Sequence, residues 1–177
     1  GFSLNNRKRH EKDDRNMMYK EFVRFIEVLQ PKVVVLENVS GMRSTGNFVS
    51  DIENDLSRAG NMKATSKLLF APDYGVPQKR KRLVFVGIKD VDFDFSDVIA
   101  THGPGLTPYV TIEEAIGDLP SLLPKESSSK YSKPARSEYQ KIMRSKSGKF
   151  ECHTAPNHPL DTIERIKATK PGEPMYP

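Results

Sequence analysis

Apolar residues in the first half of the chain follow helical spacing and strand spacing in turn. One set recurs every three or four residues and predicts a helix that stops before Pro31. The members of this set are Met18, Phe22, Phe25, Ile26 and Leu29. Residues 33–36 form an uninterrupted, mostly β-branched run, which is typical of a strand covered on both faces. Two-sided burial predicts a parallel sheet in a layered α/β fold.

The same alternation continues along the chain. A second helix face, which ends at Gly60, is formed by Phe48, Ile52, Leu56 and Ala59. Residues 67–70 and 83–88 then have the composition of strands. The segment between them, 71–81, is rich in proline, glycine and basic residues and lacks a helical period. A helical crossover does not fit there, so we expect the two strands to be antiparallel.

The second half of the chain is more polar. Thr111 and Glu114 have the spacing of a capping box, which predicts a short helix. Residues 124–149 are rich in serine and basic residues and predict a solvated excursion with one helix at 138–144. A last short helix is expected to open near Asp161.

Composition narrows the class of protein. Of the 177 residues 36% are hydrophobic, and the net charge of +5 is consistent with a polyanionic partner. The single cysteine excludes an intramolecular disulfide framework and a cysteine-rich zinc module. No apolar run approaches a membrane span and no signal peptide opens the chain, so we expect a soluble protein of a reducing, intracellular compartment.

The first candidate for chemistry is Glu37-Asn38-Val39, directly after the apolar run at 33–36. Ligands of open α/β sheets bind beyond the carboxyl ends of the strands, so Glu37 would project into the active cleft. The apolar strand behind it would partly desolvate the carboxylate and favour its neutral, hydrogen-bond-donating form. The alternative is a Glu-Asn pair that caps the next loop.

The second candidate is the basic run at 78–82. If Arg82 begins the following strand, Gln78, Arg80 and Arg82 share one face and the two lysines between them take the other. Arginines held in this way can bind a phosphate or a carbonyl oxygen in a fixed geometry. The alternatives are a nuclear localisation run and a solvated basic edge strand.

Two further groups are weaker candidates. The charged opening loop carries Ser3 and Arg15, and loops of this kind either contact backbone phosphates or are merely solvated. Cys152, His153 and His158 could suggest a metal site, but with no second cysteine and a proline-rich flank we expect none.

Four segments, in this order and spacing, resemble the DNA cytosine-5 methyltransferase family: Gly1-Phe2-Ser3, Asp14-Arg15-Asn16, 31–41 and 73–82. The Glu-Asn-Val and Gln-x-Arg-x-Arg elements within them are the most diagnostic. The resemblance implies a partial Rossmann-like, S-adenosylmethionine-dependent methyltransferase fold of the α/β class, comprising the C-terminal half of the sheet with an antiparallel last strand. Residues 1–95 would then belong to the catalytic domain, and 96–177 to a basic segment leading toward a target-recognition domain.

The resemblance also implies a reaction. Family members flip a cytosine out of double-stranded DNA, add a cysteine thiolate to C6 and transfer the methyl group of S-adenosylmethionine to C5. Glu37 would bind the ring N3 and the exocyclic amine, and Arg82 would hold O2. Gln78 and Arg80 would support the pocket and its loop, and Asn38 belongs to the same substrate-binding set.

Further residues are assigned by the same resemblance. Ser3 and Arg15 match loop positions that contact phosphates around the flipped base. Asn16 and Met18 match positions that line the cofactor pocket, most of which would lie outside this chain. The family's Pro-Cys-Gln element, with the nucleophilic cysteine, would directly precede Gly1, so we expect the chain to be inactive alone.

Several expectations remain open at this stage. Cys152 should not be assigned the role of the nucleophile, and the missing N-terminal half or a second chain would complete the sheet. One rival interpretation is an RNA cytosine-5 methyltransferase of the same family. The other is a noncatalytic nucleic-acid-binding subunit, which would bind in a salt-dependent way without a preference for cytosine.

Overall fold

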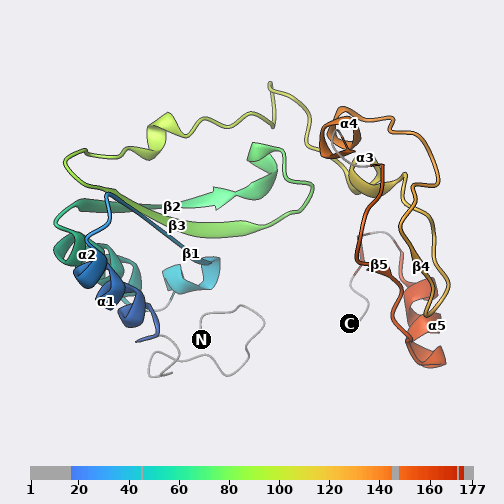
Figure 1. Ribbon diagram of the computed structural model, residues 1–177, viewed down its shortest axis with the longest axis horizontal. Helices are drawn as coiled ribbons and strands as arrows, with labels where there is room; N and C mark the ends of the chain where they lie inside the picture. The colour runs from blue at the N-terminus through green and yellow to red at the C-terminus, as the bar shows by residue number, and fades with distance from the viewer. Residues whose placement is uncertain (1–16, 45, 145–147, 171, 174–177) are drawn as a thin grey trace. The chain divides into compact units, whose positions relative to one another are not determined.

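The structure, a computed structural model, describes residues 17–44, 46–144, 148–170 and 172–173. The chain divides into two compact units, Gly1–Val110 and Thr111–Pro177, which we call unit 1 and unit 2. Their helices and strands are shown in Figure 1. Unit 1 contains the longer elements: α1 (Tyr19–Leu29), β1 (Val33–Val39), α2 (Phe48–Gly60), β2 (Lys63–Phe70) and β3 (Lys81–Ile88).

The three strands of unit 1 form one sheet in the order β1-β3-β2. β3 is antiparallel to both neighbours, so β1 and β2 run in the same direction and α2 connects them. The antiparallel pair predicted for 67–70 and 83–88 is confirmed, and both strands begin earlier in the chain than predicted. Because the connection between β2 and β3 contains only a short 3-10 turn, β3 returns directly beside β2.

The two-sided burial predicted for residues 33–36 is wrong for the described part of the chain. Val34 is buried, whereas Val33 and Val35 on the opposite face are 52% and 58% exposed. The described strands pair only in antiparallel fashion, because β3 takes the place beside β1. The parallel sheet predicted from this run is therefore not formed among them, and β1 has a hydrogen-bonded neighbour there on one edge only.

The core of unit 1 lies between one face of the sheet and the two helices. Alternate strand residues point to this face, among them Val34 on β1 and Leu83 and Phe85 on β3. The predicted buried face of α2 is confirmed, because Ile52 and Leu56 are fully buried. Other members of this core are Tyr19, Val23, Ile26, Met42, Ala59, Met62 and Ala64.

The face predicted for α1 needs a correction. The helix buries Tyr19, Val23 and Ile26, whereas Phe25 and Leu29 are 53% and 70% exposed. The tyrosine can face the core because its hydroxyl donates a hydrogen bond to the buried Asp55 carboxylate at 2.9 Å. Phe25 and Leu29 thus lie on an exposed stripe of the helix, whereas Ile26, from the same predicted set, lies in the core.

Two 3-10 turns lie at the end of the sheet where β1 and β2 finish and β3 begins. The turn η2 (Ser40–Ser44) follows β1 and is anchored by Met42, which is fully buried. The turn η3 (Ala71–Tyr74) follows β2. A third such turn, η4 (Phe95–Asp97), lies in the segment after β3, which Figure 1 shows passing back along the sheet. This segment, expected to lead into the second half of the chain, belongs to unit 1 as far as Val110.

Unit 2 is built from short elements. They are α3 (Ile112–Ile116), β4 (Ser127–Ser128), α4 (Glu138–Arg144), β5 (His153–Thr154) and α5 (Leu160–Ala168). The predicted capping box is confirmed, because Thr111 Oγ1 accepts from Glu114 N at 3.1 Å and the Glu114 carboxylate accepts from Thr111 N at 2.8 Å. The helix predicted at 138–144 is also confirmed. Across both units, none of the described helices has the length and apolar character needed to cross a membrane.

Candidate functional site

Glu37 and Arg82 are brought together by the β1–β3 ladder. In this register Glu37 lies opposite Val84, and Arg82 lies opposite Val39, so the two side chains are diagonal neighbours on one face of the sheet. Their side chains form an ion pair between Arg82 Nε and Glu37 Oε1. The two residues singled out for base binding therefore share one site, at the end of β1 and the start of β3.

The ion pair leaves much of its hydrogen-bonding capacity free for a ligand. The Glu37 side chain is 55% exposed and that of Arg82 is 23% exposed. Arg82 Nη1 donates to the carbonyl of Lys81 at 3.0 Å, which fixes one side of the guanidinium. A guanidinium has five N–H donors and a carboxyl group can accept or, when protonated, donate. Together they suit a planar polar edge that carries both acceptors and donors. The desolvation expected for Glu37 is not provided by the described residues.

Asn38 is turned toward its own backbone. Its side-chain oxygen accepts a hydrogen bond from the amide of Val39 at 2.8 Å. The sequence left open that Glu37 and Asn38 cap the next loop. Asn38 does bind the backbone that leads into this loop, whereas among the described residues Glu37 does not. The amide NH2 group of Asn38 makes no hydrogen bond within the described residues, and its role in substrate binding stays a prediction.

Gln78 and Arg80 lie in the loop before β3, and both are exposed. The strand begins at Lys81, so the alternation predicted from Gln78 onward holds only from that residue. The backbone of the loop is nevertheless tied down, because Ala71 N donates to the carbonyl of Arg80 at 2.8 Å. Within the described residues neither side chain forms a hydrogen bond or ion pair with Glu37 or Arg82.

The remaining predicted site residues are Ser3, Arg15, Asn16 and Met18. The first three lie outside the described residues. Met18 directly precedes α1 and is 69% exposed. The role of these residues in cofactor and phosphate binding therefore stays a prediction.

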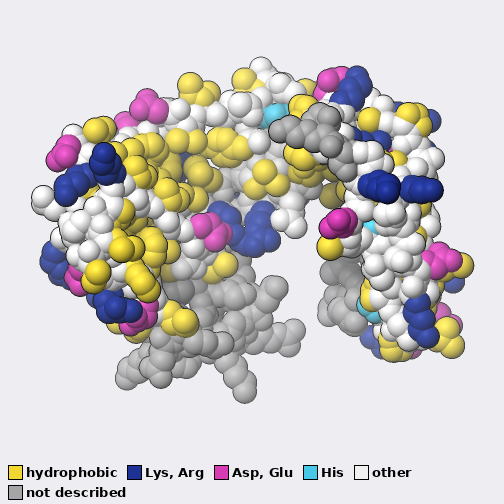
Figure 2. All heavy atoms as spheres, in the orientation of Figure 1, with side chains coloured by type: hydrophobic (Ala, Val, Ile, Leu, Met, Phe, Trp, Pro, Cys, Tyr) yellow, Lys and Arg dark blue, Asp and Glu magenta, His cyan; other side chains and the backbone are white. Residues whose placement is uncertain are grey.

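An apolar groove runs between α1 and β1. It has a volume of about 290 Å³ and is lined by Phe22, Phe25, Ile26, Leu29, Pro31, Val33, Val34 and Val35. Figure 2 shows hydrophobic side chains gathered over this part of unit 1. Soluble proteins seldom leave a contiguous surface of this kind uncovered.

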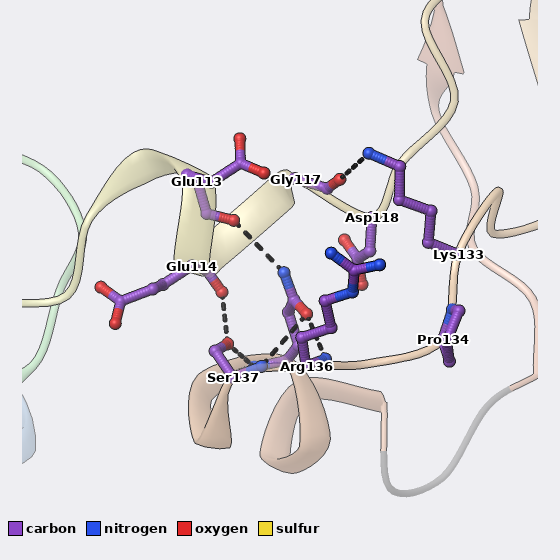
Figure 3. Close-up of a pocket in the computed structure, with 9 residues that line it drawn as sticks. Glu113, Glu114, Gly117, Asp118, Lys133, Pro134, Arg136 and Ser137 are labelled. Atoms are coloured by element: carbon purple, nitrogen blue, oxygen red, sulfur yellow. Dashed lines mark hydrogen bonds between the residues drawn. The ribbon is translucent and has the colours of Figure 1, made fainter.

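Unit 2 has a polar pocket of about 260 Å³ between α3 and α4 (Figure 3). Two of its lining residues, Gln140 and Asp118, are buried. The side-chain oxygen of Gln140 accepts from Arg136 N at 2.8 Å, and its amide donates to the carbonyl of Glu113 at 3.3 Å. The buried Asp118 carboxylate also forms an ion pair with Arg144, which is partly buried. Carboxylates and basic groups are mixed along the wall, and these contacts join α4 to α3 and to the residues that follow α3.

Sequence reasoning did not identify these contacts of unit 2. The available signal was Asp118 within a Gly-Asp-Leu-Pro run, a charged residue among apolar neighbours. His153, considered above as a metal ligand, instead hydrogen bonds to the carbonyl of Pro120 at 2.8 Å. Cys152 is exposed and not in a disulfide. Within the described residues no cluster of three or more His, Cys, Asp or Glu side chains could hold a metal ion.

Comparison with known proteins identifies the family. The model of the C-5 cytosine-specific DNA methylase family matches residues 1–171. The chain therefore belongs to this family, and the resemblance carried by its Glu-Asn-Val and Gln-x-Arg-x-Arg elements is confirmed. Similar curated proteins include the type II methyltransferase M.BspRI of Lysinibacillus sphaericus, 46% identical over 112 residues that cover 60% of this chain and 26% of the relative. M.DdeI of Desulfomicrobium norvegicum is 36% identical over 182 residues, which cover 98% of this chain and 43% of the relative.

The fold agrees with this membership. A candidate DNA modification methyltransferase encoded within a prophage (E. coli) superposes with a TM-score of 0.56 at 22% identity, covering 88% of this chain and 45% of that chain. The predicted partial methyltransferase fold with an antiparallel last strand is thus confirmed. The chain spans less than half the length of both M.BspRI and M.DdeI.

Proposed function

We propose that this chain is the base-binding part of a DNA (cytosine-5-)-methyltransferase. The whole enzyme would transfer a methyl group from S-adenosylmethionine to C5 of a cytosine flipped out of double-stranded DNA, through a covalent adduct at C6. The observation that carries the proposal is the pairing of Glu37 and Arg82 on one face of the sheet. Membership of the C-5 cytosine-specific family supports it.

The two side chains have complementary roles in this proposal. As the base binds, one proton taken up from solvent is shared between the Glu37 carboxylate and the ring N3 of the cytosine. The other carboxylate oxygen of Glu37 accepts from the exocyclic amine, and the Arg82 guanidinium donates to O2. Addition of a thiolate to C6 pushes electron density onto N3 and O2, where these donors are already aligned. Before the base enters, the carboxylate and guanidinium neutralise each other. When the cytosine enters, its polar edge takes the place of the ion pair and forms hydrogen bonds to both Glu37 and Arg82.

The nucleophile, in this proposal, is a cysteine outside the 177 residues. Cys152, the one cysteine of the chain, is exposed. A catalytic thiolate needs nearby groups that lower its pKa. Among the described residues Cys152 forms no hydrogen bond or ion pair with a basic side chain. The chain by itself would therefore bind the base without methylating it.

We further propose that the apolar groove between α1 and β1 is covered by the rest of the methyltransferase domain. Val33 and Val35 project from β1, which among the described residues has a hydrogen-bonded neighbour on one edge only, and Phe25 and Leu29 line the same groove. The relatives are more than twice as long as their matched part. A strand added beside β1, with an apolar segment over α1, would satisfy both the open backbone groups and the exposed side chains.

The decisive experiment is a methyl-transfer assay on the whole methyltransferase with Glu37→Gln or Arg82→Ala. Each substitution removes a charged group that hydrogen bonds to the base in the transition state, so the rate of methyl transfer should fall about a hundredfold or more. The matched control is the exposed pair on α1, in which Arg24 Nε lies 2.9 Å from a carboxylate oxygen of Glu21. Glu21→Gln and Arg24→Ala should leave the rate within about twofold of wild type.

Near-wild-type rates in both site variants would refute the assigned roles. The assay also decides between nucleic acids, because a DNA enzyme methylates duplex DNA and leaves transfer RNA unmodified. Methylation of transfer RNA alone would favour the RNA methyltransferase interpretation. Salt-dependent binding without methylation of either would favour the noncatalytic binding subunit.

A further inference from the structure

The turn that leads into the Arg82 strand is held by a distant segment of unit 1. The carbonyl of Asp73, in η3, accepts hydrogen bonds from the backbone amides of Thr101 at 2.9 Å and His102 at 3.0 Å. The Asp73 carboxylate accepts from the hydroxyl of Tyr109 at 2.9 Å. A single residue of the turn thus binds both ends of the segment 101–109.

Two glycines make room for this contact. Gly75 ends the turn with a φ of +80°, and a Cβ on it would lie 2.8 Å from Cε1 of the His102 ring. Gly103 has a φ of +136°, and a Cβ there would meet the Tyr109 hydroxyl at 3.3 Å. Either side chain would crowd the imidazole or the phenol, and both backbone conformations favour glycine. We call the set of Asp73, Gly75, His102, Gly103 and Tyr109 the clasp.

Aromatic packing adds to the clasp. The Tyr109 ring stands edge-on to Phe70, the last residue of β2, with centroids 6.2 Å apart. The imidazole of His102 is oriented by Thr101 Oγ1, which lies 2.8 Å from its Nδ1. The segment 101–109 is therefore fastened at both the end of β2 and the turn that follows it.

The clasp is one short loop away from Arg82. The loop that starts at Ala71 closes on itself through the bond from Ala71 N to the carbonyl of Arg80 at 2.8 Å. Within it, Gly75 N and Val76 N donate to the carbonyls of Pro72 and Ala71. Holding Asp73 in place therefore also holds the start of the loop that carries Arg80 and leads into β3, where Arg82 lies.

We propose that Asp73 and Tyr109 are positioning residues for the base-binding site, holding the loop so that Arg82 keeps its place beside Glu37. The inference rests on the proposed function, since the site it serves is the cytosine-binding site. A guanidinium displaced by about 1 Å from its productive position can cost up to a hundredfold in rate. The side chains of the clasp act through the backbone and touch no reacting atom.

The test compares Tyr109→Phe, Asp73→Ala and Asp73→Asn in the whole methyltransferase. The first two remove the hydroxyl–carboxylate bond, and kcat should fall about tenfold while KM for the methyl donor and the Tm stay near wild type. Asp73→Asn keeps an oxygen that accepts from Tyr109, so it should restore kcat to within about twofold. Tyr74→Phe is the matched control, because the Tyr74 hydroxyl makes no hydrogen bond within the described residues.

Hydrogen exchange supplies a readout that does not depend on catalysis. The amides of Gly75 and Val76 should exchange faster in Tyr109→Phe and Asp73→Ala, and at the wild-type rate in Asp73→Asn. The proposal that Asp73 and Tyr109 position the loop would be refuted if both the amide exchange rates and kcat stayed unchanged in Tyr109→Phe and Asp73→Ala. It would also be refuted if Tyr74→Phe lowered kcat by the same factor. A whole protein without methyltransferase activity would refute the proposed function, and the exchange of these two amides would still decide whether the clasp holds the loop.

Discussion

Glu37 on β1 and Arg82 on β3 form an ion pair across two strands, two positions apart in the ladder register. Antiparallel pairing places the end of one strand beside the start of the other, so both side chains lie at the same end of the sheet. A register shift of one residue would turn either side chain to the opposite face, against the helices. The buried residues Val34, Leu83 and Phe85 fix that register, and the core of unit 1 thereby sets the geometry of the site.

If the two side chains act on one cytosine, their mutations should not be additive. We expect the double variant Glu37→Gln with Arg82→Ala to lose little more methyl-transfer activity than the worse single variant, because each single change already misplaces the base. The measurement is a double-mutant cycle on kcat in the whole enzyme. Losses that multiply would mean that the two side chains act independently, contrary to a shared site.

Asp55 should make the stability of unit 1 sensitive to acid. Burial acts to raise the pKa of Asp55, but hydrogen bonds from Lys20 and Tyr19 outweigh it and hold the pKa below the ordinary value of 3.8. Because the pKa of Asp55 is lower in the folded state than in the unfolded state, the ionised carboxylate stabilises the fold at any pH above the ordinary pKa. This stabilisation is lost as the pH falls through the pKa of the folded state. The free energy of unfolding should therefore decline below about pH 4.

The variant Asp55→Asn tests this directly by denaturant unfolding at several pH values. At neutral pH it should lose about 2 kcal/mol, because it keeps an acceptor but loses the charge that holds Lys20 and Arg58. Wild type and variant should converge as Asp55 becomes protonated at low pH. Asp92→Asn is the control, since its pair with Lys63 is exposed. A constant difference between wild type and Asp55→Asn down to pH 2 would contradict the assignment.

The two apolar stripes of α1 should respond differently to truncation. Ile26 is buried in the core, so Ile26→Ala should cost about 2–5 kcal/mol of unfolding free energy in the 177-residue chain. Leu29 is 70% exposed, so Leu29→Ala should have little effect in that chain. In the whole methyltransferase the groove would be covered, and Leu29→Ala should then destabilise as well. An equally small effect of Leu29→Ala in both contexts would argue against a covered groove.

Cys152 should be dispensable for catalysis. We expect Cys152→Ser to leave kcat of the whole methyltransferase within about twofold of wild type, because the proposed nucleophile is a different cysteine outside the 177 residues. Methyl transfer to duplex DNA is the measurement, with mass spectrometry of the purified protein to verify the substitution. A loss of about a thousandfold or more would assign the nucleophile to Cys152 and refute its proposed location outside the chain.

Features that depend on neighbouring residues in the chain could be predicted from the sequence. The helix face of Ile52 and Leu56 follows from a repeat of 3.6 residues, and the Thr111–Glu114 capping box follows from a spacing of three. The antiparallel return of β3 follows from the lack of a helical crossover after Phe70. Family membership could also be predicted, because its motifs are short contiguous runs in a set order.

Features that depend on which surfaces meet could be read only from the tertiary structure. The rotation of α1 follows from the bond between Tyr19 and Asp55, since a tyrosine can be buried once its hydroxyl has a partner. The exposure of Val33 and Val35 depends on what lies beside β1, which the apolar run itself cannot indicate. The ion pair of Glu37 with Arg82 and the bond of Asp73 with Tyr109 join residues far apart in the chain, and only the packing of the sheet and its turns brings them within reach.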